Sequence, residues 1–165
     1  MKRILIALLL CGLPLCLANA QDDKSEATLA ASYLQVQNID TKTANLTGDL
    51  LFSLVPRLHL GPAVSFGYSK NGTVTTTGAG VGVGLDFDLL TKTVRPFVGV
   101  QGLYWFGDFS NTIQYEASAR AGLKIGGGPA FLKLFYERTR QYQASGVPNA
   151  QRDLNQVQVG LGIRF

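Results

Sequence analysis

The residues of this chain that could do chemistry are carboxylates and basic side chains that recur at even spacings. Asp86 and Asp88 flank Phe87, and Arg120 and Lys124 stand four residues apart. In a β-strand, residues two or four apart point to the same face of the sheet. Applied along the chain, this parity places five acidic and five basic side chains on one face: Asp49, Asp86, Asp88, Glu116 and Glu137, with Arg95, Arg120, Lys124, Lys133 and Arg164.

Catalytic chemistry has few candidates. The sequence holds a single histidine, His59, and no Gly-x-Ser-x-Gly motif, so a Ser–His–acid triad lacks evident members. The glycine-rich run at 78–84 lacks the fingerprint of a phosphate-binding loop. A lone histidine among polar neighbours is more often structural than catalytic, and one histidine without cysteines makes a poor metal site. We therefore predict no enzymatic activity, no cofactor and no metal.

The N-terminal residues predict export. A basic start, an apolar run at 4–17 and a small-x-small site at 18–20 are the three regions of a secretory signal peptide. A lipoprotein signal at Cys16 is a weaker alternative, because the two residues before it fit such a site poorly. The expected boundaries are a cleaved signal peptide at 1–20, a short N-terminal segment at 21–25 and one folded domain at 26–165.

Cleavage changes what the composition implies. Both cysteines, Cys11 and Cys16, lie in the expected leader, so the mature chain would have no thiol for a disulfide or a metal. It would have 145 residues (165 − 20), and loss of Lys2 and Arg3 lowers the net charge from +4 to +2. So small a charge gives little support to nucleic acid as a partner, and we expect none.

The elements that would position the charged residues are segments in which apolar residues alternate with polar residues or glycine. In the last segment, for example, Val159 and Leu161 alternate with Gly160 and Gly162. This is the pattern of strands that face lipid on one side and a polar interior on the other. Eight segments are expected, most of them about ten residues long: 26–37, 44–54, 58–69, 78–89, 94–104, 112–125, 131–137 and 157–165. The predicted fold is all-β, an eight-stranded antiparallel up-and-down transmembrane β-barrel.

The connections predict an orientation. An even number of strands puts both termini on one side, expected to be the periplasm, together with short turns at 55–57, 90–93 and 126–129. The longer connections then lie outside the cell. The aromatic residues with a polar tip all fall at the outer ends of their strands, where the headgroup region favours them: Tyr33, Tyr68, Tyr104, Trp105, Tyr115, Tyr136 and Tyr142.

The C-terminal segment carries a resemblance to a known family. Gln158, Gly160, Ile163 and the terminal Phe165 resemble the C-terminal signal of outer-membrane barrel proteins. In pattern and length the whole expected mature chain resembles the small eight-stranded barrels of the OmpA/OmpX type, the outer-membrane β-barrel domain family. The resemblance implies a monomeric, multi-pass protein of a Gram-negative outer membrane. It implies assembly by the barrel-assembly machinery and contact with outer-membrane lipids and lipopolysaccharide.

Within such a barrel, the ten charged residues predict a closed interior. Eight strands enclose a space about wide enough for their own side chains, and unpaired buried charges are costly. We therefore expect a salt-bridged plug and a structural or surface-interaction role, in adhesion or envelope integrity. Two alternatives stay open: a narrow or gated porin-like channel, and a lipid-modifying enzyme. Arg138 and Arg140 continue the outward face of their segment and could pair with lipopolysaccharide phosphates.

Overall fold

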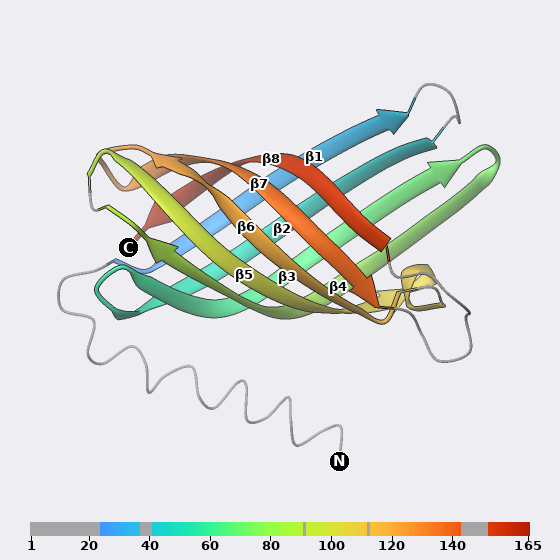
Figure 1. Ribbon diagram of the computed structural model, residues 1–165, viewed down its shortest axis with the longest axis horizontal. Helices are drawn as coiled ribbons and strands as arrows, with labels where there is room; N and C mark the ends of the chain where they lie inside the picture. The colour runs from blue at the N-terminus through green and yellow to red at the C-terminus, as the bar shows by residue number, and fades with distance from the viewer. Residues whose placement is uncertain (1–23, 37–40, 91, 112, 143–151) are drawn as a thin grey trace, which may run out of the picture.

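The chain folds as a closed barrel of eight antiparallel strands, each paired with its neighbours in sequence (Figure 1). This computed structural model describes residues 24–36, 41–90, 92–111, 113–142 and 152–165. The elements are β1 (Glu26–Val36), β2 (Thr41–Val55), β3 (Leu58–Asn71), β4 (Val74–Asp88), β5 (Val94–Gly107), the short 3-10 helix η2 (Asp108–Asn111), β6 (Tyr115–Ile125), β7 (Ala130–Tyr142) and β8 (Arg152–Arg164). β1 pairs with β8 from Glu26 opposite Arg164 to Ala31 opposite Val159, which closes the ring. The predicted fold class is confirmed.

No helix in the described part of the chain is long and apolar enough to cross a membrane. The expected signal peptide and most of the segment after it lie outside the described residues, as does most of the connection between β7 and β8.

The strands form where side chains alternate in polarity, and they run further than apolar alternation alone indicates. β7 alternates between exposed and buried residues along its whole length, to Tyr142 rather than to 137. The part of β7 after residue 137 contains Arg138, Thr139 and Arg140. These residues are polar on both faces of the strand, so an alternation of apolar residues does not indicate this part. β6 begins at Tyr115, three residues later than expected.

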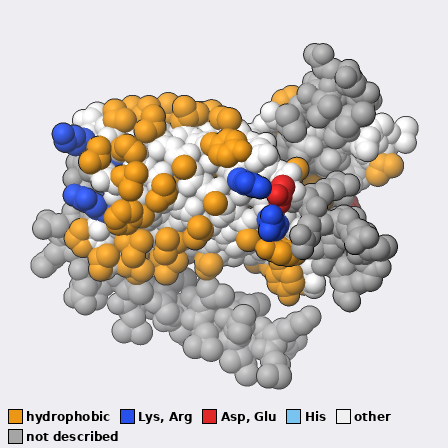
Figure 2. Space-filling view, in the orientation of Figure 1, with side chains coloured by type: hydrophobic (Ala, Val, Ile, Leu, Met, Phe, Trp, Pro, Cys, Tyr) orange, Lys and Arg blue, Asp and Glu red, His pale blue; other side chains and the backbone are white. Residues whose placement is uncertain are grey.

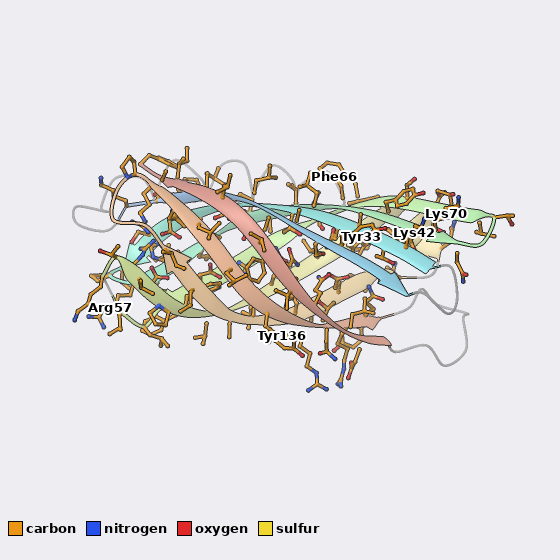
Figure 3. The ribbon with its side chains drawn as sticks, turned by 90° about the horizontal axis from the view of Figure 1, so that it is seen from above. Tyr33, Lys42, Arg57, Phe66, Lys70 and Tyr136 are labelled. Atoms are coloured by element: carbon orange, nitrogen blue, oxygen red, sulfur yellow. The ribbon has the colours of Figure 1, made fainter. Side chains whose placement is uncertain are left out.

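The two ends of the barrel differ. We call the end where β1 begins and β8 finishes the terminal end; it also carries the Pro56-Arg57 turn and the connections at 89–93 and 126–129. We call the opposite end the loop end; there Gly72 adopts a positive φ of 57° in the two-residue turn between β3 and β4. Figure 3 shows Arg57 at the terminal end and Lys42 and Lys70 at the loop end.

Large apolar side chains cover the outside of the barrel (Figure 2). Leu161 is 70% exposed and Phe66 is 58% exposed, and every strand contributes such residues. Figure 3 shows Phe66 and Tyr136 pointing away from the barrel on opposite sides. A continuous apolar wall around a closed sheet is the outer surface of a membrane-spanning barrel, because lipid covers it and no backbone edge is left open.

Trp105 departs from the expected aromatic ring. Its side chain is only 4% exposed and packs inside the barrel with Ala63 and Leu103. The reason is strand parity: Tyr104 takes the outward position on β5, so its neighbour must point inward. Five of the six tyrosines are exposed on the outside, as the sequence predicts: Tyr33, Tyr68, Tyr115, Tyr136 and Tyr142.

Candidate functional site: the charged lumen

The ten charged residues singled out from the sequence come from six strands, and nine of them are buried inside the barrel. Asp49 lies on β2, Asp86 and Asp88 on β4, Arg95 on β5, Glu116, Arg120 and Lys124 on β6, Lys133 and Glu137 on β7, and Arg164 on β8. Arg164 is half-buried at the terminal end. The inside of the barrel is therefore lined by ionisable groups, while the outside is apolar.

Next to the terminal end, the basic side chains gather on Glu26. Its carboxylate lies 2.6 Å from Arg95 Nη2, 2.6 Å from Lys124 Nζ and 3.3 Å from Arg164 Nε. Asp88 shares two of these cations, with 2.8 Å to Arg95 Nη1 and 2.8 Å to Lys124 Nζ. Glu26 is absent from the lumen set expected from the sequence, because it begins the least regular of the eight segments, although the outward position of Ala27 places it on the inward face.

A second group of ion pairs lies nearer the middle of the barrel. Arg120 bridges Asp49 at 2.8 Å and Asp86 at 2.9 Å. Lys133 Nζ lies 2.8 Å from Asp86 and 3.4 Å from Asp49, and Gln101 donates a 3.0 Å hydrogen bond to Asp49. Lys124 Nζ, 3.5 Å from Asp86, connects this group to the first. The result is one continuous network across the lumen.

Inward phenylalanines pack against the cations of the network. The Phe97 ring centroid lies 4.8 Å from Lys133 Nζ and 5.1 Å from Lys124 Nζ. The Phe131 ring lies 4.7 Å from the Arg164 guanidinium carbon, and Phe135 stacks edge-on against Phe97. These rings occupy space beside the charges and add cation–π attraction to them. In the sequence, these phenylalanines interrupt an inward face that is otherwise polar. Their contacts with the cations give a structural reason for their inward direction.

Glu116 and Glu137 do not pair with the basic residues as the sequence analysis expected. Glu116 accepts hydrogen bonds from Trp105 Nε1 at 3.2 Å and from Gln141 Nε2 at 3.1 Å. Glu137 accepts from Gln156 at 3.0 Å and from Gln158. Arg120 is the register neighbour of Glu137, but its ion pairs go to the carboxylates across the lumen. Parity shows which face a residue occupies, and it does not show which partner it reaches.

One group of side chains could hold a metal ion. A carboxylate oxygen of Glu26, a carboxylate oxygen of Asp88 and a ring nitrogen of His59 lie within 4.8 Å of one another, and all three residues are buried. The His59 Nε2 atom lies 3.7 Å from Asp88 Oδ2. Both carboxylates already bind arginine and lysine, so a metal would have to displace cations that neutralise them. The arrangement is that of an ion-paired cluster.

The residues of the expected assembly signal lie on both faces of β8 and, for Phe165, directly after it. Gln158 and Gly160 point inward, where the Gln158 side chain donates to Glu137, and Ile163 and Phe165 are exposed outside. The Phe165 backbone nitrogen donates a 3.0 Å hydrogen bond to Ser25 O. The C-terminal residues therefore also close the barrel against β1.

Arg138 and Arg140 lie on the outer surface near the loop end. Both are exposed, and both bond to Asp153 of β8, Arg138 through Nη2 at 3.1 Å and Arg140 through Nε at 3.1 Å. Below them on the same face, the Tyr136 hydroxyl bonds to Asn155 at 2.7 Å.

Comparison with known proteins bears on the fold. No protein-family model matches the chain, and no curated protein matches its sequence. Among solved structures, the chain is similar to the N-terminal β-barrel domain of Pseudomonas aeruginosa OprF, with 16% identity, a TM-score of 0.53, and coverage of 88% of this chain and 100% of that chain.

Two further structures are similar at lower scores. One is described as "De novo design of transmembrane beta-barrels" (17% identity, 88% and 98% coverage, TM-score 0.49). The other is the outer-membrane enzyme PagL (12% identity, 85% and 99% coverage, TM-score 0.46). The closed ring of eight antiparallel strands and the similarity to the OprF barrel domain show that the fold is that of the small eight-stranded transmembrane β-barrels.

Proposed function

We propose that the chain is an integral outer-membrane barrel protein whose lumen is closed by ion pairs and whose role is structural or in surface interaction. The observation that carries the proposal is the continuous buried network that joins Glu26, Asp88, Asp86 and Asp49 through arginine and lysine. A path for ions would have to pass between groups held 2.6 to 2.9 Å apart. Opening such a path would separate buried charges, which is costly.

Three features support the outer membrane as the location. The outer wall is apolar on every strand, the strands of 11 to 15 residues are long enough to span the hydrocarbon, and the N-terminal residues read as an export signal. In the proposed orientation the terminal end faces the periplasm and the loop end faces the outside, in keeping with short periplasmic turns.

The orientation can be tested by labelling. The proposed mature chain has no cysteine, so a single introduced one is unique. Thr73→Cys lies at the loop end and Gly128→Cys at the terminal end, and both positions are exposed. A membrane-impermeant maleimide applied to intact cells should label Thr73→Cys and should label Gly128→Cys only after permeabilisation. The reverse pattern would contradict the orientation.

The structural role predicts a phenotype that a channel would not produce. Cells without the chain should become more sensitive to detergents and large hydrophobic antibiotics, because the envelope loses a rigid barrel. Uptake of small solutes should stay unchanged, because the lumen is closed. Slower solute uptake with unchanged detergent sensitivity would favour the channel alternative.

Contact with lipopolysaccharide is part of the proposal. Two arginines share one aspartate at the loop end, which leaves a net charge of +1 (2 − 1) on an exposed patch above Tyr136. Guanidinium groups match phosphate geometry well. Lipopolysaccharide should raise the thermal unfolding midpoint of the wild type in detergent, and raise it less in the Arg138→Ala/Arg140→Ala variant. Lys70→Ala serves as the matched control, since Lys70 is another exposed cation at the loop end. An undiminished response in the double variant would end this part of the proposal.

We propose no catalytic role. The single histidine is 2% exposed and lies inside the barrel beside Asp88, away from the lipid-facing wall. A lipid-modifying reaction would require a base that reaches the lipid or the surface.

A further inference from the structure

A cavity of about 60 Å³ opens in the loop-end half of the lumen, apart from the ion-paired network. Its wall includes Glu116, Thr139, Gln141 and Gln156 on the polar side and Trp105 and Phe109 on the apolar side. These residues come from β5, η2, β6, β7 and β8, so the cavity is part of the barrel interior.

Glu116 brings to this cavity a carboxyl group that has no basic partner when it is ionised. Its side chain is 8% exposed, and the donors that reach its Oε2 atom, Trp105 and Gln141, are both neutral. Among the described residues, no lysine or arginine forms an ion pair with it. A carboxylate withdrawn from water without a counter-charge is costly. A cation that enters the cavity would supply the missing counter-charge and so favour the ionised carboxylate.

Thr139 is a second, independent indication of a ligand. Its side chain is 1% exposed and lines the same cavity, and its Oγ1 atom has no hydrogen-bond partner in the described part of the chain. Buried hydroxyls normally have a partner. The Thr139 hydroxyl can accept a hydrogen bond from a group in the cavity, as can the Glu116 carboxylate.

The apolar wall limits the kind of cation. Trp105 and Phe109 pack edge to face with ring centroids 5.3 Å apart, and Ile113 packs against them. Calcium requires about six to eight oxygen ligands and binds best where several are carboxylates. This cavity offers a single carboxylate, with hydroxyl and amide groups on its polar side and aromatic rings on the other. A quaternary ammonium has no N–H group to donate to Thr139 Oγ1 or to the Glu116 carboxylate. A primary ammonium has three N–H donors and an apolar stem that suits aromatic rings.

We propose that this cavity binds a primary alkylammonium group, with Glu116 and Thr139 accepting from the ammonium and Trp105 and Phe109 packing against its alkyl stem. The ammonium can belong to a free small amine or to the end of a lysine side chain. The proposal concerns a site separate from the plug, and it holds whether or not the barrel conducts ions.

Trp105 makes the site directly observable. It is the only tryptophan of the chain and its indole donates to Glu116, so its fluorescence reports on this cavity alone. The folded chain in detergent micelles at neutral pH would be titrated with ethylammonium chloride. We expect a saturable change in emission. Sodium, calcium and tetramethylammonium chlorides at equal ionic strength should produce none. Equal responses to these salts would overturn the proposal.

Two matched variants complete the test. Glu116→Gln keeps an acceptor for Trp105 and Gln141 but removes the charge, and it should weaken ethylammonium binding by about ten- to hundred-fold, as expected for a hydrogen bond to a charged group. Glu137→Gln is the control, because Glu137 is also buried and bonded to neutral amides. It should bind like the wild type. Heat-modifiable gel mobility would establish that each variant is folded. Wild-type affinity in folded Glu116→Gln would overturn the site.

A final comparison identifies the source of the ammonium. If Nα-acetyl-lysine methylamide binds as ethylammonium does, the cavity accepts the end of a lysine side chain. If only ethylammonium binds, the ligand is a free small amine. Binding of neither compound would overturn the proposal.

Discussion

Among the described carboxylates, Glu26 is one of two, with Asp86, on which three lysine or arginine side chains converge. Three basic side chains bond to its carboxylate, at 2.6, 2.6 and 3.3 Å. Removing one partner of a buried ion pair costs about 3–5 kcal/mol, because the remaining charge stays buried. Glu26→Gln should therefore lower the free energy of unfolding in lipid vesicles by about that amount, measured by urea titration. Glu116→Gln, the same change at a carboxylate with neutral partners, should cost about 1 kcal/mol or less. Equal losses in the two variants would mean that the network does not stabilise the barrel.

Trp105 offers a test of side-chain direction at the same scale. Because its indole faces the lumen, brominated lipids should leave its fluorescence largely unquenched. A variant in which Trp105→Phe is combined with Phe66→Trp moves the only indole to a lipid-facing position that is 58% exposed. Its fluorescence should be strongly quenched in the same lipids. Strong quenching of the wild type would contradict the inward position.

At the scale of elements, the closing seam between β1 and β8 depends on a small residue. A Cβ atom at Gly160 would come within 2.8 Å of both the Ala30 Cβ atom and the Leu29 carbonyl oxygen. Gly160→Val should therefore reduce refolding yield in lipid vesicles that contain no assembly machinery. Gly128→Ala is the control, since nothing lies within 4 Å of a Cβ atom there. Normal refolding of Gly160→Val would show that this glycine serves only as part of an assembly signal.

The strands could be predicted from the sequence, but their interior partners could not. A barrel in lipid imposes a period of two residues on every strand, so the alternation in β3, β4 and β6 indicates both their existence and their inward faces. Which side chains pair inside the lumen depends on their positions along the barrel axis and around the barrel wall. Asp49 of β2 reaches Arg120 of β6 across the lumen, whereas Glu137 lies beside Arg120 in the register without pairing with it. Only the closed structure determines such contacts.

At the scale of the whole molecule, the lumen is divided along its length. The terminal half holds four acids and five bases, for a net charge of +1 (5 − 4), with His59 taken as neutral. The loop half holds Glu116 and Glu137 with amide and indole donors. Under the proposed function, the barrel is closed where its charges are paired. The cavity by Glu116 lies on the loop-end side of these ion pairs.

The central claim, a lumen closed by ion pairs, is tested most directly by single-channel conductance of refolded residues 21–165 in a planar bilayer. We predict that the wild type and the exposed-charge control Lys70→Gln are silent. Asp86→Asn combined with Arg120→Gln, which removes two members of the network, should produce openings. Steady conductance of the folded wild type that changes in this variant and not in the control would contradict the account, since the charged lumen would then be a pathway.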